Sequence, residues 1–193
     1  MGRGFLLSHF CQWCWNKMKI NNIQRLIEEY DTEKIIFTEI GPRARKNCVL
    51  NFDDFYKICM WKSRRQKNRY LKNKNKVENI SRKAFLTSDE TKKIELLCGL
   101  DGVGIPTASA ILTVLYPENY SIIDIRCIET LNHLGYKMKN VMTVNNWLKY
   151  LEIMRDLAKE NNVTTRDLDK ALFALHRRIL DEKGFVNLYG RKP

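Results

Sequence analysis

Residues 97–112 read Leu-Cys-Gly-Leu-Asp-Gly-Val-Gly-Ile-Pro-Thr-Ala-Ser-Ala-Ile-Leu, and Asp124 follows twelve residues later. Gly102 and Gly104 predict a turn that is too tight for side chains. Pro106 suits the first turn of a helix, and apolar residues recur after it at helical spacing. The stretch therefore predicts two helices joined by a short hairpin.

A hairpin of this kind can bind a phosphate group. Glycines let the backbone come close to a ligand, and the free N–H groups at the start of the following helix point towards that ligand. We therefore expect the hairpin and the first amides of the next helix to form a phosphate site.

At these residues the chain resembles the helix-hairpin-helix superfamily of DNA base-excision glycosylases, in which a Leu-x-Gly-Val-Gly-x-x-Thr-Ala hairpin grips the DNA backbone. The resemblance covers about Leu96 to Leu131. It implies an all-α, glycosylase-like helical bundle, in one body or in two lobes with the site between them. The hairpin contacts that it implies involve Gly102, Val103, Gly104 and Thr107, and the turn carbonyls could also bind a monovalent cation.

Asp124 is the candidate catalytic residue. The superfamily has an Asp about twenty residues beyond the hairpin, at the mouth of the base pocket, and Ile122-Ile123-Asp124 occupies the matching place. Hydrolysis of an N-glycosidic bond passes through a sugar with oxocarbenium character. A fixed carboxylate can stabilise that sugar and activate water once the base has left the duplex. The structural alternative is that Asp124 only caps its helix, and the two roles are compatible.

Two positions depart from the superfamily pattern. Many members cleave the strand through a hairpin Lys that forms a Schiff base, and Pro106 stands at its position, eighteen residues before the Asp. Proline has no amine, so we expect a monofunctional enzyme with doubtful lyase activity, for which Lys92 or Lys93 would have to substitute. Asp101 stands where Pro is frequent, and its carboxylate would weaken a phosphate grip unless it points away.

The positive charge of the chain is concentrated in one segment. The net charge is +12 over 193 residues, and residues 43–93 hold 16 Lys and Arg against five Asp and Glu. Self-repulsion of this size favours a polyanionic partner over a merely solvated face. The residues expected to contact phosphates are Lys62, Arg64, Arg65, Lys67, Arg69, Lys74 and Lys76.

Three further side chains are candidates for the DNA interface. Trp61 and Tyr70 stand at the two ends of the charged run. Either could line the base pocket or wedge into the base stack, although aromatic residues at the end of an apolar helical face are more often part of the core. Arg126 could approach a backbone phosphate or pair with Glu129.

No cofactor is expected. The cysteine quartet that holds an iron–sulfur cluster in some superfamily members is absent after Cys127. Cys11 and Cys14 have the spacing of half a zinc site, but no second pair follows at zinc-finger spacing. Several of the six cysteines lie in apolar helical patterns, which is typical of reduced thiols. No apolar run is long enough to span a bilayer. We expect a cytoplasmic, nucleoid-associated protein.

The rest of the chain predicts helices and no strands. Helix starts are expected near Asn51, at Asp124 and Thr143, and at the capping-box pairs Thr87/Glu90 and Thr164/Asp167. Residues 41–47 indicate a loop, and residues 72–76 should be mobile until an anion orders them. The organisation predicted is a single helical domain, 1–193, with a basic segment at 43–93 and the hairpin and catalytic Asp at 88–134.

The sequence thus predicts a DNA glycosylase that removes a damaged, modified or mismatched base from double-stranded DNA and leaves an abasic site. One alternative is a non-catalytic helix-hairpin-helix DNA-binding module that has the hairpin and the basic segment without the pocket. A further alternative is an RNA-binding protein, because a basic segment with aromatic residues does not distinguish the two nucleic acids.

Overall fold

The computed structural model describes residues 19–29 and 35–182. Throughout these residues the regular secondary structure is helical, with no β-strand, and the prediction of an all-α fold is confirmed for this part of the chain. The sequence predictions for residues 1–18, including the Cys11 and Cys14 pair, lie outside the described residues.

The main helices follow one another along the chain as α1 (Ile23–Glu28), α2 (Gly41–Asn47), α3 (Phe52–Lys62), α4 (Lys67–Tyr70), α5 (Val77–Leu86), α6 (Glu90–Cys98), α7 (Ile105–Leu115), α8 (Ile125–His133), α9 (Val144–Asn161) and α10 (Thr165–Glu182). Three short helical segments supplement them: the π-helix η1 (Ile36–Ile40) and the 3-10 helices η2 (Arg64–Gln66) and η3 (Leu71–Asn73).

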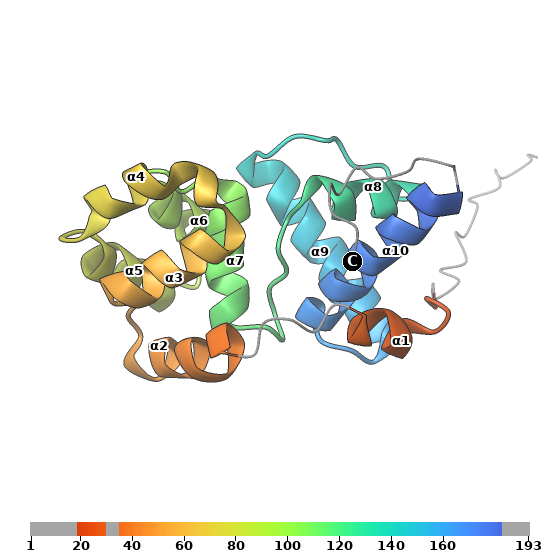
Figure 1. The fold of residues 1–193 in the computed structure, drawn as a ribbon, viewed down its shortest axis with the longest axis horizontal. Coiled ribbons are helices and arrows are strands. Elements are labelled where there is room, and N and C mark those ends of the chain that lie inside the picture. The colour runs from red at the N-terminus through yellow and green to blue at the C-terminus, as the bar shows by residue number, and fades with distance from the viewer. Residues whose placement is uncertain (1–18, 30–34, 183–193) are drawn as a thin grey trace, which may run out of the picture.

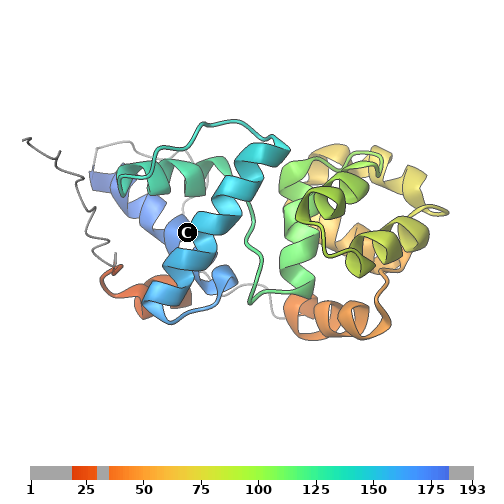
Figure 2. The same ribbon diagram turned by 180° about the vertical axis from the view of Figure 1, so that it is seen from behind.

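The helices form two groups (Figure 1). We call α2 to α7 the hairpin lobe, in which α7 packs against α2, α3 and α6. We call α1 and α8 to α10 the C-terminal lobe, in which α10 packs against the other three. The non-helical segment 116–124 joins the lobes and consists of a turn at residues 117–119 followed by an extended run to Asp124. Figure 2 shows α9 alongside the hairpin lobe, where it contacts α6. One hydrophobic cluster includes buried residues of both lobes.

Helix α7 is the centre of the hairpin lobe. Every side chain from Thr107 to Leu115 is buried, so the helix is surrounded by protein on all sides. Helix α2 crosses it so closely that a Cβ atom on Gly41 would lie 2.2 Å from the Val114 carbonyl oxygen. The prediction of a loop at residues 41–47 is therefore wrong. The proline of this segment lies in the first turn of α2, where proline is tolerated, and tertiary packing decides the conformation.

The hairpin turn lies between α6 and α7, at residues 99–104, and it depends on one glycine. Gly102 has a φ of +82°, and a Cβ atom there would lie 2.9 Å from the Cβ of Arg69. Gly104 has a φ of −103°, and its nearest neighbour would be 3.9 Å away. The expectation that both glycines are needed for a tight turn thus holds for Gly102 only.

Asn73 clamps the same turn from the basic segment. Its side chain is fully buried, its Nδ2 donates to the Asp101 carbonyl oxygen at 2.9 Å, and its Oδ1 accepts from the Asp101 N–H at 2.8 Å. The Lys72–Lys76 run, expected to be mobile, is instead partly helical and packed on the hairpin. Lys76 also pairs with the Asp101 carboxylate at 2.8 Å.

Most predicted helix starts are present with their capping hydrogen bonds. Asn51, Asp124, Thr143 and Thr164 each accept a bond from a backbone N–H in the first turn of the next helix. The prediction for α6 is wrong. Asp89 rather than Thr87 caps this helix, by accepting from the Lys92 N–H at 3.1 Å. Both residues are favoured caps, and sequence spacing does not choose between them.

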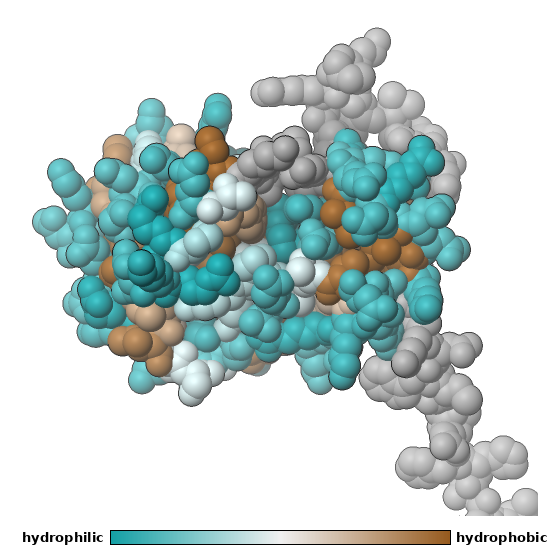
Figure 3. Space-filling model, turned by 90° about the horizontal axis from the view of Figure 1, so that it is seen from below, coloured by the Kyte–Doolittle hydropathy of each residue, from teal (hydrophilic) through white to brown (hydrophobic). Residues whose placement is uncertain are grey.

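The described surface is mostly polar. Figure 3 views the molecule from the side on which α1 and α2 lie, and hydrophilic side chains cover most of that face, with apolar side chains gathered on the half that holds α1. None of the described helices has the length and apolar character that crossing a bilayer requires.

We expect Gly102→Ala to lower the free energy of unfolding by about 1–3 kcal/mol, because alanine is strained at this φ and its Cβ would collide with Arg69. The matched control, Gly104→Ala, should cost less, about 1 kcal/mol at most, because the Cβ has room at this φ and only the N-cap preference of α7 is lost. Urea denaturation measures both values. Equal losses in the two variants would contradict this description of the turn.

Candidate active site

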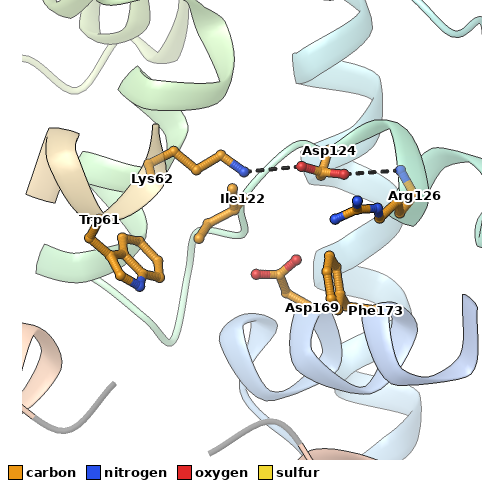
Figure 4. Close-up of a pocket in the computed structure, with 7 residues that line it drawn as sticks. All are labelled: Trp61, Lys62, Ile122, Asp124, Arg126, Asp169 and Phe173. Atoms are coloured by element: carbon orange, nitrogen blue, oxygen red, sulfur yellow. Dashed lines mark hydrogen bonds and ion pairs between the residues drawn. The ribbon is translucent and has the colours of Figure 1, made fainter. Parts of the chain in front are cut away.

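A pocket of about 180 Å³ opens between the two lobes. Its lining comes from both lobes and from the segment that joins them: Trp61 and Lys62 at the end of α3, Ile122 and Asp124 on the joining segment, Arg126 on α8, and Asp169 and Phe173 on α10 (Figure 4). The candidate catalytic Asp124 thus lies in a pocket assembled from three separate parts of the sequence, residues 61–62, 122–126 and 169–173.

Buried hydrogen bonds hold the joining segment in place. The Ile123 N–H donates to Ser109 Oγ of α7 at 3.2 Å. The Ile122 carbonyl accepts from the Tyr150 hydroxyl of α9 at 3.0 Å, and that hydroxyl also accepts from Ser121 Oγ at 3.0 Å. Because these groups are buried, the segment cannot shift without leaving polar atoms unpaired. The backbone just before Asp124 is therefore fixed against both lobes.

Asp124 pairs with Lys62 across the pocket. The Lys62 ammonium donates to Asp124 Oδ2 at 3.1 Å, while Asp124 Oδ1 accepts from the Arg126 backbone N–H at 3.1 Å (Figure 4). Burial raises the pKa of the Asp124 carboxyl. The charge of Lys62 and the hydrogen bond from Arg126 outweigh burial and hold that pKa below its ordinary value. Asp124 is therefore an ionised carboxylate at neutral pH.

The capping role and the pocket role of Asp124 are fulfilled by different oxygen atoms. One oxygen caps α8, as the structural alternative predicts, and the other faces Lys62 and the pocket. About 29% of the side chain is exposed, enough to be reached from the pocket. The cap fixes the direction of the carboxylate without removing it from the site.

Asp169 is a second carboxylate in the same pocket, and sequence reasoning missed it. It is buried on α10, where Oδ1 accepts from the Cys127 thiol at 3.3 Å and Oδ2 accepts from the Arg166 guanidinium. Burial raises the pKa of Asp169 above its ordinary value, against the opposing charges of Arg166 and Lys62. Asp169 and Arg166 are one helical turn apart, but nothing in the sequence indicates that they approach Asp124.

Two aromatic side chains form opposite walls of the pocket (Figure 4). The Trp61 ring meets Phe37 edge to face, with ring centroids 5.9 Å apart, and the Arg166 guanidinium lies 5.7 Å from the Trp61 centroid. Across the pocket, the Arg126 guanidinium lies 5.1 Å from the Phe173 centroid. Trp61 and Arg126 were expected at the DNA interface, and the structure places both in this pocket.

Two of the predicted interface residues lie inside the core instead. Tyr70 is completely buried and meets Phe55 edge to face, with centroids 6.2 Å apart, so it is not available as a wedge or as a pocket wall. Thr107 is buried near the Tyr70 hydroxyl. Its backbone N–H donates to the Gly104 carbonyl at 2.9 Å, so neither its side chain nor its amide is presented to a ligand.

Other backbone N–H groups of the hairpin differ in whether they are available to a phosphate. Val103 is buried, and its N–H donates to the Leu100 carbonyl at 3.1 Å. The N–H groups of Gly102, Gly104 and Ile105 make no hydrogen bond within the described part of the chain. A phosphate site at the hairpin would therefore use these three amides rather than the predicted run from Gly102 to Thr107.

The basic segment divides between the surface and the pocket. Arg64, Arg65 and Lys74 are exposed, as phosphate-contacting residues would be. The Lys76 ammonium donates a hydrogen bond to the Asp101 carboxylate and is therefore already paired within the protein. This hydrogen bond is the main reason why the pKa of Asp101 lies below its ordinary value. Lys62 does not belong to the exposed strip, because its ammonium points into the pocket.

The lysines considered as hairpin substitutes lie elsewhere. Lys92 is exposed on α6, and Lys93 donates to the Tyr120 hydroxyl at 2.7 Å. Neither lines the pocket. Among the described residues, no three His, Cys, Asp or Glu side chains gather in a way that could hold a metal ion.

No family model matches the chain, and no solved structure matches it.

We expect Lys62→Met to remove a stabilising contribution that depends on pH. A carboxyl whose pKa is depressed on folding contributes stability above its unfolded-state pKa, about 4, and loses it as the pH falls through the folded-state value. The difference in unfolding free energy between wild type and Lys62→Met should therefore be larger at pH 7 than at pH 3. Urea denaturation across this range measures it.

Lys67→Met is the control, because Lys67 is exposed and removal of its charge should have an effect that varies little with pH. A wild-type advantage over Lys62→Met that stays constant from pH 7 to pH 3 would show that the Asp124 carboxylate is not what Lys62 stabilises.

Proposed function

We propose that this protein is a DNA glycosylase that hydrolyses the N-glycosidic bond of a base turned out of double-stranded DNA. The observation that supports it best is the pocket between the lobes, where Lys62 and the start of α8 hold Asp124 as a carboxylate. In the sequence, Asp124 follows the hairpin at the place where the chain resembles the helix-hairpin-helix glycosylases. We propose that the two lobes are also arranged as in those enzymes.

The chemistry needs a fixed negative charge beside the deoxyribose. As the bond breaks, its electron pair leaves with the base and positive charge develops on the sugar. Asp124 stabilises that charge, and its pocket-facing oxygen accepts a proton from the water that attacks the sugar carbon. Lys62 acts through Asp124, since it favours the ionised carboxylate before substrate arrives.

Binding of the DNA backbone would come from the surface beside the pocket. Arg64 and Arg65 follow Lys62 almost directly in sequence and are exposed on η2. The free amides of the hairpin supply a second place for a phosphate. This arrangement would hold the duplex while the extruded nucleotide enters the pocket.

The proposal is for a monofunctional enzyme. Pro106 offers no amine, and Lys62, the only lysine among the described residues that line the pocket, is paired with Asp124. An ammonium in an ion pair is not a nucleophile. Strand cleavage before any alkali treatment would contradict this part of the proposal and would assign a Schiff-base role to Lys62.

The direct test of catalysis is Asp124→Asn. Wild type and variant are incubated with labelled duplexes that each carry one damaged, modified or mismatched base, and hot alkali then cleaves any abasic site. We expect wild type to release a base and Asp124→Asn to be slower by about 100-fold or more, with duplex affinity retained, because the amide has lost the charge.

The control for Asp124→Asn is helix stability, since asparagine is also a good cap and the fold should be kept. If wild type binds duplexes in a salt-sensitive way and releases no base from any of them, the non-catalytic binding module is the correct function. Equal affinity for single-stranded RNA and duplex DNA would favour the RNA-binding alternative.

Binding by the exposed strip is tested with the double variant Arg64→Gln/Arg65→Gln. Each lost phosphate contact should reduce the slope of log affinity against log salt concentration by about 1. The control, Lys139→Gln/Lys159→Gln, removes the same charge from exposed positions in the C-terminal lobe. If both double variants weaken binding to the same extent, then net charge rather than this strip determines the affinity.

A further inference from the structure

Asp169 is a buried charged side chain that lines the pocket and takes no part in the hydrolysis described above. Its side chain is only 5% exposed, and it stands across the pocket from Asp124 (Figure 4). Burial of a carboxylate costs several kcal/mol even when a partner compensates, and apolar residues would pack as well. A purely structural ion pair with Arg166 leaves unexplained why the carboxylate faces the pocket.

The hydrogen bonds of Asp169 leave acceptor capacity on both oxygens. The Cys127 thiol donates to Oδ1 and the Arg166 guanidinium to Oδ2. An ionised carboxylate has about four acceptor sites and no donor. Burial raises the pKa of Asp169, the cations Arg166 and Lys62 oppose that rise, and Asp124 lies across the pocket. The thiol and the guanidinium both donate to the carboxyl group, so that it acts as an acceptor on both oxygens. Asp169 can therefore receive two further N–H groups from a ligand.

Only one of the common base edges presents two adjacent N–H donors. Guanine carries a ring N1–H next to its 2-amino group. Adenine and cytosine place a ring acceptor beside the amino group, and uracil and thymine place a single N–H between two carbonyl oxygens. If a carbonyl oxygen or an acceptor ring nitrogen of the base faced Asp169, its lone pairs would repel those of the carboxylate. Burial increases the free-energy cost of this repulsion.

We propose that Asp169 selects the extruded base by accepting the N1–H and 2-amino N–H of a modified or mispaired guanine. The proposal rests on the glycosylase function proposed above. Trp61 and Phe173 supply apolar contact on either side of the base. The hydrogen bonds from Arg166 and Cys127 fix the orientation of the Asp169 carboxylate before the base arrives. Asp124 remains the catalytic residue, and Asp169 determines specificity.

The test uses four duplexes that differ in the donors on this edge. 8-Oxoguanine and 7-methylguanine keep both N–H groups, and hypoxanthine keeps N1–H only. Uracil presents a single ring N–H between two carbonyl oxygens. We expect wild type to release at least one of the first two, with hypoxanthine at least about 100-fold slower and uracil slower still, because a missing donor leaves the buried carboxylate unpaired.

The variant is Asp169→Asn, with Asp156→Asn on the exposed face of α9 as the charge-matched control. Asp169→Asn should release the guanine-type base at least about 100-fold more slowly than wild type. Its affinity for a duplex with a tetrahydrofuran abasic site, which has no base to read, should stay within about threefold of wild type. If Asp169→Asn unfolds early in thermal denaturation, Asp169→Glu provides a second variant. It keeps the carboxylate but moves it one methylene further from the backbone.

The outcomes separate this inference from the function on which it rests. Release of uracil as fast as the guanine-type bases, or full activity in Asp169→Asn, overturns the inference and leaves the glycosylase proposal in place. Release of no base by wild type contradicts the glycosylase proposal itself, and the inference is rejected with it.

Discussion

The structure depends on the hydrogen bonds that fix the extended segment between the lobes. This segment lies between the two lobes and forms no β-strand, so its buried polar groups need partners outside regular secondary structure. Ser109 of α7 and Tyr150 of α9 provide them from opposite sides. The position of Asp124 is thereby tied to both lobes, and Lys62 reaches it from the end of α3.

The electrostatic design of the pocket follows from this arrangement. Two carboxylates enter one pocket, and their surroundings move their pKa values in opposite directions. Lys62 and the α8 N-terminus favour the charged form of Asp124, whereas the burial of Asp169 works against its charge and requires Arg166 as a partner. Different environments for two acids in one pocket are compatible with the two roles proposed for Asp124 and Asp169.

The sequence predicts the parts of this structure that are local. Helical periodicity gives the all-α class, and the cap at Asp124 follows from the preference of a short polar side chain for a helix start. Partners far apart in the chain have no such signal. Lys62 contacts Asp124 across 62 positions, and the approach of Asp169 to the same pocket requires the packing of α10.

Aromatic and basic residues are difficult to assign for a related reason. Tyr70 and Trp61 both border the charged run, yet one is buried and the other lines the pocket. Tyr70 is buried because the hairpin packs on α4, with Gly102 against the Tyr70 ring, and no local pattern reveals this contact. The loop predicted at residues 41–47 was wrong because α7 offers a surface that no local pattern reveals.

The proposed role of Asp124, to stabilise a sugar cation, can be tested with two abasic duplexes. One carries a protonated pyrrolidine in place of the sugar, as a mimic of the developing charge, and the other carries a neutral tetrahydrofuran. We expect wild type to bind the pyrrolidine duplex at least about tenfold more tightly than the tetrahydrofuran duplex, and Asp124→Asn to bind both equally. Equal binding of the two duplexes by wild type would contradict it.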